Sequence, residues 1–212
     1  MDRAEVKARS EHLIRSLGGK TLDWLPWLDR SQPRASAEVA ERTLAMHALL
    51  GIYFQAPIPV IATWIQDNGL EGAPSRRERA LLGIREGELT QQDRIDLYWY
   101  IEALWAFAWA GKLIPDLPID KPVGDNLASL LPNIENGERG DAFRTAYALR
   151  SFADIFQMLD IYFRAHWYAR DGQLSGYATG AFNLDIIMER RRALEWISDR
   201  TIGDWDETPE ST

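Results

Sequence analysis

The sequence predicts an all-α protein, a single globular domain of about seven or eight helices around a central aromatic-rich helix at residues 91–110. Several segments of helix length carry apolar residues at spacings of three and four and are bounded by capping residues, glycine or proline. Alternating apolar and polar runs of the kind that form sheets do not recur along the chain. With 212 residues, 46% of them hydrophobic and nine of them tryptophan, the chain can bury one large core.

The first predicted helix covers residues 2–17 and ends at two consecutive glycines. An extended connector follows over residues 21–34, because its two prolines keep the preceding residue out of the helical region. Trp24 and Trp27 lie in this connector. We expect their side chains to hold it against the body of the protein.

Three further helices are predicted between the connector and the central helix, each from its capping chemistry. Ser36 is expected to cap the first of them, and Ser75 with Glu78 has the spacing of a capping box for the third. The second begins at a proline and ends at a glycine. The predicted ranges are 36–53, 57–68 and 75–85.

The helix at residues 91–110 opens after Thr90 and closes at Gly111. Its second half, YWYIEALWAFAWAG from residue 98, is apolar on nearly every face and holds one carboxylate, Glu102. A helix that is apolar all round belongs in the interior. We therefore expect it to be the central helix.

The second half of the chain is predicted to add further helical segments. Ser151 is expected to cap a long helix that ends at Gly172, and Asn183 or Asp185 the last helix. The final residues carry five acids and one arginine, a net charge of −4 out of −8 for the chain. The predicted ranges are 125–131 (a turn), 142–148, 152–172 and 184–199, with residues 1–198 as the domain and 199–212 as an acidic tail.

Composition narrows the classes of function. Without cysteine there is no thiolate nucleophile and no cysteine-based zinc site. The charged N-terminus lacks the features of a signal peptide, so we expect a cytoplasmic protein. The longest apolar run, residues 97–110, is too short to span a bilayer. An acidic chain without a basic stripe argues against a nucleic-acid partner.

The candidate site is a set of polar residues on apolar helix faces. Glu102, His166 and Glu189 each occupy an inward position on a different predicted helix, so they could converge in the core. Arg164 and Arg190 lie close to them in sequence and could neutralise them. The set could hold a ligand or a metal or act in acid/base chemistry, or it could be buried ion pairs that close on themselves.

Aromatic residues on the same helices would line such a site. The helical Glu-x-x-His motif of carboxylate–histidine metal proteins is absent, as are the phosphate-loop and nucleotide-binding glycine motifs. We therefore predict no cofactor and assign no metal ligands. The predicted aromatic lining consists of Tyr98, Trp105, Trp109, Trp167 and Trp196.

Several segments together resemble a known family. EALWAFAWAGKLIPDLP from residue 102, MLDIYFRAHWYARD from residue 158 and MERRRALEWI from residue 188 occur in an order that resembles the bacterial family called domain of unknown function 4272. The resemblance covers nearly the whole chain and implies a cytoplasmic helical domain, without catalytic residues to carry over. Glu195 departs from the family pattern, where asparagine is expected. The matching positions are Glu102, Leu104, Trp109, Arg150, Arg164, His166, Trp167, Glu189, Arg190, Ala193, Leu194 and Trp196.

Three functional hypotheses follow from these observations. The first is a binding or protein-interaction domain with a buried Glu/Arg/His cluster, whose partner is a protein or a small polar ligand. The second is a metal-dependent or acid/base hydrolase that uses Glu102, His166 and Glu189. The third is an immunity-type protein that neutralises a basic partner through its acidic surface. The oligomeric state is left open.

Overall fold

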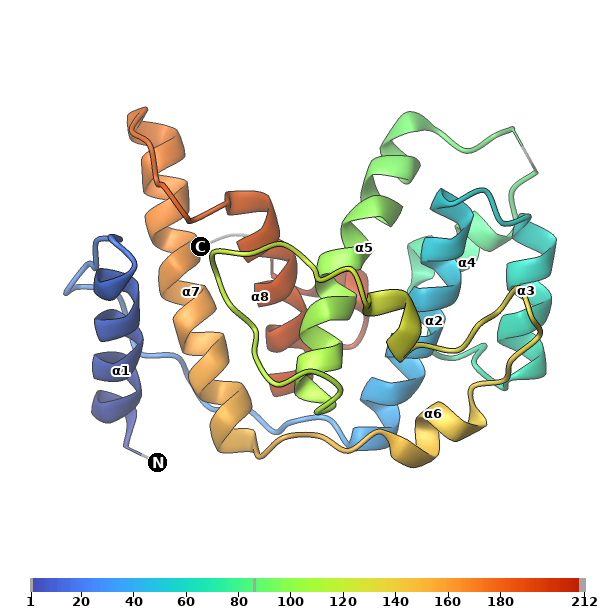
Figure 1. Cartoon of the computed structure of the whole chain (residues 1–212), viewed down its shortest axis with the longest axis horizontal. Coiled ribbons are helices and arrows are strands. Elements are labelled where there is room, and N and C mark those ends of the chain that lie inside the picture. Colours follow the sequence, from blue (N-terminus) through green and yellow to red (C-terminus); the bar gives the residue numbers. More distant parts are fainter. Residues whose placement is uncertain (1, 86, 210–212) are drawn as a thin grey trace.

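The computed structural model describes residues 2–85 and 87–209, and in these residues every regular element is helical (Figure 1). This confirms the predicted all-α class and the predicted number of helices. None of these helices combines the length and apolar character needed to cross a membrane. The elements are α1 (Arg3–Ser16), α2 (Ser36–Tyr53), α3 (Ile58–Asp67), α4 (Arg76–Leu82), α5 (Gln91–Ala110), η1 (Leu127–Leu130), α6 (Asp141–Ala146), α7 (Phe152–Ser175), α8 (Leu184–Ser198) and η2 (Trp205–Glu207).

Helix α5 lies at the centre of the molecule, between α8 on one side and α2 on the other (Figure 1). Helix α7 packs on α8, and α1 packs on the outer side of α7. Every residue of α5 from Ala103 to Ala110 is less than 9% exposed, as expected for a helix that is apolar on nearly every face. The predicted central helix is thus confirmed.

Most helix ends follow the predicted capping chemistry. Ser75, Thr90, Ser151 and Asn183 each accept a hydrogen bond from a backbone N–H in the first turn of the following helix. The prediction for Ser36 is wrong by one residue. Ser36 is the first helical residue, and its hydroxyl donates to the carbonyl of Tyr147 instead.

Helix α7 continues three residues beyond its predicted end at Gly172. That glycine is buried inside the helix, where a Cβ atom would lie 2.1 Å from Thr179 Cγ2. The left-handed conformation that ends the helix occurs at Gly176, with φ of 74°. Close packing, and not helix termination, therefore explains the glycine at 172.

The connector before α2 is extended as predicted, and the expectation for its tryptophans is met only in part. Trp24 is 66% exposed, but its ring packs edge-on against that of Trp167 on α7 at 5.4 Å; Trp27 is 53% exposed. Leu25 and Arg34, both buried, also hold the connector. The backbone N–H of Arg34 donates to the carbonyl of Ile197 at 2.9 Å, which ties the connector to the end of α8.

Residues 199–209, which belong to the predicted acidic tail, pack against the helices; residues 210–212 lie outside the described residues. Trp205 is 3% exposed, and its ring lies 5.9 Å from that of Phe107. Asp204 and Asp206 accept hydrogen bonds from the backbone N–H groups of the first two residues of α4, at 3.1 and 2.9 Å. Acidic side chains at a helix N-terminus satisfy donors that have no partner within the helix.

Candidate functional site

The predicted polar residues separate into distinct pairs in the structure. Glu102 on α5 pairs with Arg190 on α8, whose Nη2 lies 2.6 Å from Glu102 Oε2, and both side chains are buried. The backbone N–H of Val123 donates to the other carboxylate oxygen at 3.1 Å. The remaining Arg190 donors reach the hydroxyl of Tyr162 and the carbonyls of Pro118 and Lys121. This pair is closed on itself.

Arg164 forms a separate buried pair on α7. Its Nε donates to Asp160 Oδ2 at 2.8 Å, at the i,i+4 spacing that the sequence indicates. Its Nη1 lies 3.8 Å from Glu11 Oε1. Since Glu11 belongs to α1, Arg164 links α1 to α7.

His166 contacts a third arginine. Arg191 Nη1 donates to His166 Nδ1 at 2.8 Å, so that nitrogen is an acceptor and the imidazole is neutral. Burial, together with the positive charges of Arg191 and Arg170, lowers the pKa of His166 to about 4. Arg191 also pairs with Glu195, the residue that departs from the family pattern.

Of the predicted aromatic lining, only Trp196 borders one of the two clefts described below. Trp105 and Trp109 are buried core residues, Tyr98 is 40% exposed, and Trp167 packs edge-on against Trp24. Within residues 2–85 and 87–209, no three His, Asp or Glu side chains are grouped in a way that could hold a metal ion. The fifth predicted residue, Glu189, is 9% exposed and lines the larger cleft.

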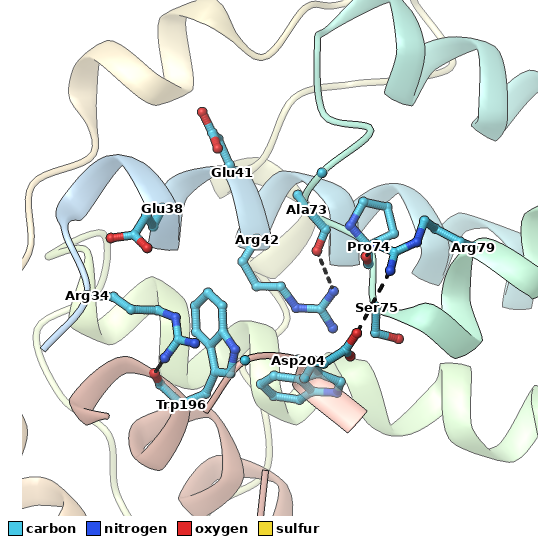
Figure 2. Close-up of a pocket in the computed structure, with 13 residues that line it drawn as sticks. Arg34, Glu38, Glu41, Arg42, Ala73, Pro74, Ser75, Arg79, Trp196 and Asp204 are labelled. Carbon is cyan, nitrogen blue, oxygen red and sulfur yellow. Dashed lines mark hydrogen bonds and ion pairs between the residues drawn. The ribbon is translucent and has the colours of Figure 1, made fainter. Parts of the chain in front are cut away.

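The smaller cleft, of about 380 Å³, lies between α2, the loop before α4, the end of α8 and the C-terminal segment (Figure 2). We call it the Arg42 cleft. It combines three guanidinium groups, three carboxylates and two indole rings. The lining residues are Arg34, Glu38, Glu41, Arg42, Gly72, Ala73, Pro74, Ser75, Arg79, Trp196, Gly203, Asp204 and Trp205.

Arg42 points from α2 toward the loop before α4 and is 1% exposed (Figure 2). Its two terminal nitrogens donate to the carboxylate of Glu78 at 2.5 and 2.7 Å, and one of them also donates to the carbonyl of Ala73 at 3.1 Å. Its third nitrogen, Nε, has no acceptor within residues 2–85 and 87–209. The guanidinium lies over the ring of Trp205, 4.7 Å from its centroid, and in the same residues the buried indole N–H of Trp205 has no acceptor either.

Charge stabilises this pair in its ionised state. Burial alone would raise the pKa of Glu78, but the charge of Arg42 and its hydrogen bonds outweigh burial and leave the pKa below the ordinary value. The same pairing raises the pKa of Arg42 despite the opposing effect of its burial. A hydrogen bond to Tyr100 further stabilises the Glu78 carboxylate.

The opposite wall of the Arg42 cleft is built by Arg34. Its guanidinium stacks on the Trp196 ring at 3.9 Å from the centroid. It donates to the carbonyls of Trp196, Asp199 and Ile202 (Figure 2 shows the first of these contacts). These carbonyls include the end of α8, so Arg34 fixes the wall in place.

The larger cleft, of about 640 Å³, lies between α4, the first half of α5, α8 and the C-terminal segment. We call it the Glu189 cleft. Trp205 lines both clefts. The lining residues are Arg77, Glu78, Leu81, Gln92, Asp93, Ile95, Asp96, Leu97, Trp99, Tyr100, Met188, Glu189, Arg192, Trp205 and Asp206.

Two residues of the Arg42 cleft, Arg42 and Trp205, were not among the predicted site residues. The sequence does indicate an inward position for Arg42, because it lies three residues after Val39 and four before Met46, on an apolar face of its helix. Trp205 is the one aromatic residue among the acids of the last segment. Its burial depends on helices distant in sequence, and composition alone indicated a tail.

The fold is that of a helical domain that carries two polar clefts. The chain belongs to the family described as Domain of unknown function (DUF4272), whose model matches residues 6–208, and the predicted resemblance is thus confirmed. No curated protein and no solved structure gives a significant match.

Proposed function

We propose that this protein is a binding domain and that the Arg42 cleft takes a small ligand through an oxyanion, either a carboxylate or a phosphate. The observation that carries the proposal is a pair of buried N–H donors, Arg42 Nε and Trp205 Nε1, which belong to two residues lining one cleft and have no acceptor among the described residues. Leaving a buried donor unpaired costs about 1–3 kcal/mol. A ligand oxygen would remove this cost at both donors.

The geometry suits an oxyanion. Arg42 stacks on Trp205, so the two free donors belong to side chains in contact with each other. The bidentate contact with Glu78 holds the guanidinium in one orientation and leaves Nε as the donor for a ligand. The cleft volume of about 380 Å³ lies within the range of small-ligand sites.

The other polar groups of the cleft support binding more than catalysis. Arg34 is held by backbone carbonyls, and the Ser75 hydroxyl caps α4 by accepting from the N–H of Glu78 at 3.2 Å. Glu38 accepts from the backbone N–H of Ala35 at 2.9 Å. Groups fixed in this way shape a site and orient what enters it.

The test is titration calorimetry and thermal unfolding with inorganic phosphate, acetate, citrate and benzoate. At least one should bind and raise the melting temperature of the natural protein. Trp205→Phe, which keeps an aromatic ring but removes the donor, should weaken that binding by about tenfold. The matched control is Trp64→Phe, because Trp64 already donates to the carbonyl of Glu138. Its affinity should be unchanged.

A second variant tests the place of binding. Gly72 lines the Arg42 cleft, and a Cβ atom there would meet nothing within 4 Å, so Gly72→Tyr should fold and fill the cleft. Loss of binding in this variant supports the proposal. Failure of all four oxyanions to bind the natural protein, or equal binding by Gly72→Tyr, would overturn it.

A further inference from the structure

We infer a second binding surface, independent of the proposed oxyanion site: the Glu189 cleft and the aromatic row beside it dock a basic, apolar segment of a partner protein. The aromatic row consists of Phe54, Tyr53, Tyr98 and Trp99. A lysine or arginine side chain of the partner enters the cleft, and apolar side chains of the same segment cover the row.

The Glu189 cleft has an excess of negative charge on apolar walls. Five carboxylates and two guanidinium groups line the cleft. One of these carboxylates, Glu78, also pairs with the buried Arg42; when Arg42 is counted as a third positive charge, the excess of negative charge is two. Its volume of about 640 Å³ is large enough for a long side chain. Leu97, Tyr100 and Met188 contribute to its walls.

The aromatic row continues from the cleft across the surface. The ring of Trp99, which lines the cleft, lies 5.4 Å from that of Tyr98, which in turn lies 5.2 Å from that of Tyr53. Phe54 ends the row, 5.0 Å from Tyr53, and is 63% exposed. Single exposed apolar residues are common, but a contiguous row leading into a cleft is typical of an interaction surface.

Charge and shape together favour one kind of occupant. Lysine and arginine carry an apolar stem with a cationic end, which matches a cleft lined by Leu97 and Met188 together with Glu189 and with Asp96, whose carboxylate pairs with Arg77. Trp99 and Tyr100 also line the cleft, and aromatic rings attract cations. Anionic partners are repelled both by the cleft and by the net charge of −8, which draws basic partners toward the protein.

The experiment uses three labelled synthetic peptides at about 150 mM salt, where nonspecific charge attraction is screened. One peptide alternates lysine with leucine, the second replaces lysine with glutamate, and the third replaces leucine with glycine. Fluorescence anisotropy with the full chain should detect binding of the lysine–leucine peptide alone. Equal binding of the lysine–glycine peptide would overturn the proposal, because the aromatic row would then contribute nothing.

Variants locate the surface. Glu189→Gln and Tyr98→Ala should each weaken binding of the lysine–leucine peptide by at least about fivefold, the effect expected of a central contact. Glu135→Gln, an exposed change of equal charge, and Leu174→Ala, which removes an exposed apolar side chain from α7, should leave it unchanged. If Glu189→Gln does not fold, Tyr98→Ala and Phe54→Ala decide the question.

Two further outcomes would also overturn the inference. Equal affinity of the natural protein and the Tyr98→Ala variant would place the peptide elsewhere. The second outcome is displacement of the peptide by n-butylammonium when the amine concentration only equals the concentration of lysine side chains in the peptide. This would show that the cleft is a site for free amines. The oxyanion titrations of the Arg42 cleft do not enter either outcome, so the two proposals can fail separately.

Discussion

Two buried Glu–Arg pairs cross the core, and they differ in how completely the arginine is satisfied. In the Glu102–Arg190 pair all three guanidinium nitrogens donate hydrogen bonds. In the Glu78–Arg42 pair the two terminal nitrogens donate and Nε does not. Both arginines are at most 1% exposed, so burial does not explain the difference.

The location of each pair gives the reason. Arg190 is enclosed by α5, α8 and the carbonyls of the loop between residues 118 and 121, which supply an acceptor for every donor. Arg42 lines a cleft, and among the described residues no acceptor lies within hydrogen-bond distance of its Nε. A closed pair stabilises the fold, whereas an open pair retains a donor for a ligand.

The largest effect should come from breaking the closed pair. Glu102→Gln leaves the buried charge of Arg190 without its counterion, and the free energy of unfolding should fall by about 3–5 kcal/mol. Urea denaturation measures this. Glu135→Gln, on the surface, should change it by less than about 0.5 kcal/mol. A small effect of Glu102→Gln would show that the pair does not hold α5 to α8.

Chemical rescue should separate the two pairs. Glu78→Ala and Glu102→Ala each leave a buried arginine without its carboxylate partner. Of the two glutamates, only Glu78 lines one of the two clefts described above. Formate at about ten times its dissociation constant should raise the free energy of unfolding of Glu78→Ala by about 1.4 kcal/mol. The same formate concentration should leave the free energy of unfolding of Glu102→Ala almost unchanged. Thermal unfolding with chloride at equal ionic strength is the control. Equal rescue of both variants would contradict the distinction.

A smaller difference is expected between two tryptophans. Trp64→Phe removes a donor that is bonded to Glu138 and leaves that carbonyl unpaired, whereas Trp205→Phe removes a donor that is already unpaired. Both variants lose the same ring atoms. Trp64→Phe should therefore be less stable than Trp205→Phe by about 1 kcal/mol, measured by urea denaturation. The reverse order would show that Trp205 has an acceptor in the free protein.

The last effect is small at neutral pH and appears in the pH dependence of stability. His166 has a pKa of about 4 in the folded protein against an ordinary value of 6.5. Between these values the unfolded chain binds a proton that the folded chain does not, so His166 makes stability rise with pH up to about 6.5 and adds no slope above it. His166→Gln should flatten the dependence between pH 5 and 6.5. An unchanged slope would mean that another group, such as His47, is responsible.

Local chemistry allowed most of the fold to be predicted. Ser75 and Glu78 lie three residues apart and form the expected capping box, and Thr90 caps the central helix where its start was expected. Asp160 and Arg164, four residues apart on α7, form an ion pair within the same helix. Interactions within one helical turn depend on spacing alone, which the sequence contains.

Long-range partners could be predicted only as candidates. Glu102 was predicted to point inward and Arg190 to neutralise a nearby carboxylate, but the two are 88 residues apart and their contact depends on how α5 packs against α8. His166 and Glu189 also point inward, yet one meets Arg191 and the other lines a cleft. Helix periodicity gives the inward face and does not give the rotation of one helix about its neighbour.

Trp205 is held between two cations, since the guanidinium groups of Arg42 and Arg192 each lie 4.7 Å from its ring. The segment of residues 199–209 is therefore a shared wall, and local opening of that segment would remove one side of both clefts together. A ligand held against Trp205 on either side favours the closed segment. If each cleft binds its proposed ligand, both ligands favour the same closed segment, and binding at one cleft is then expected to strengthen binding at the other.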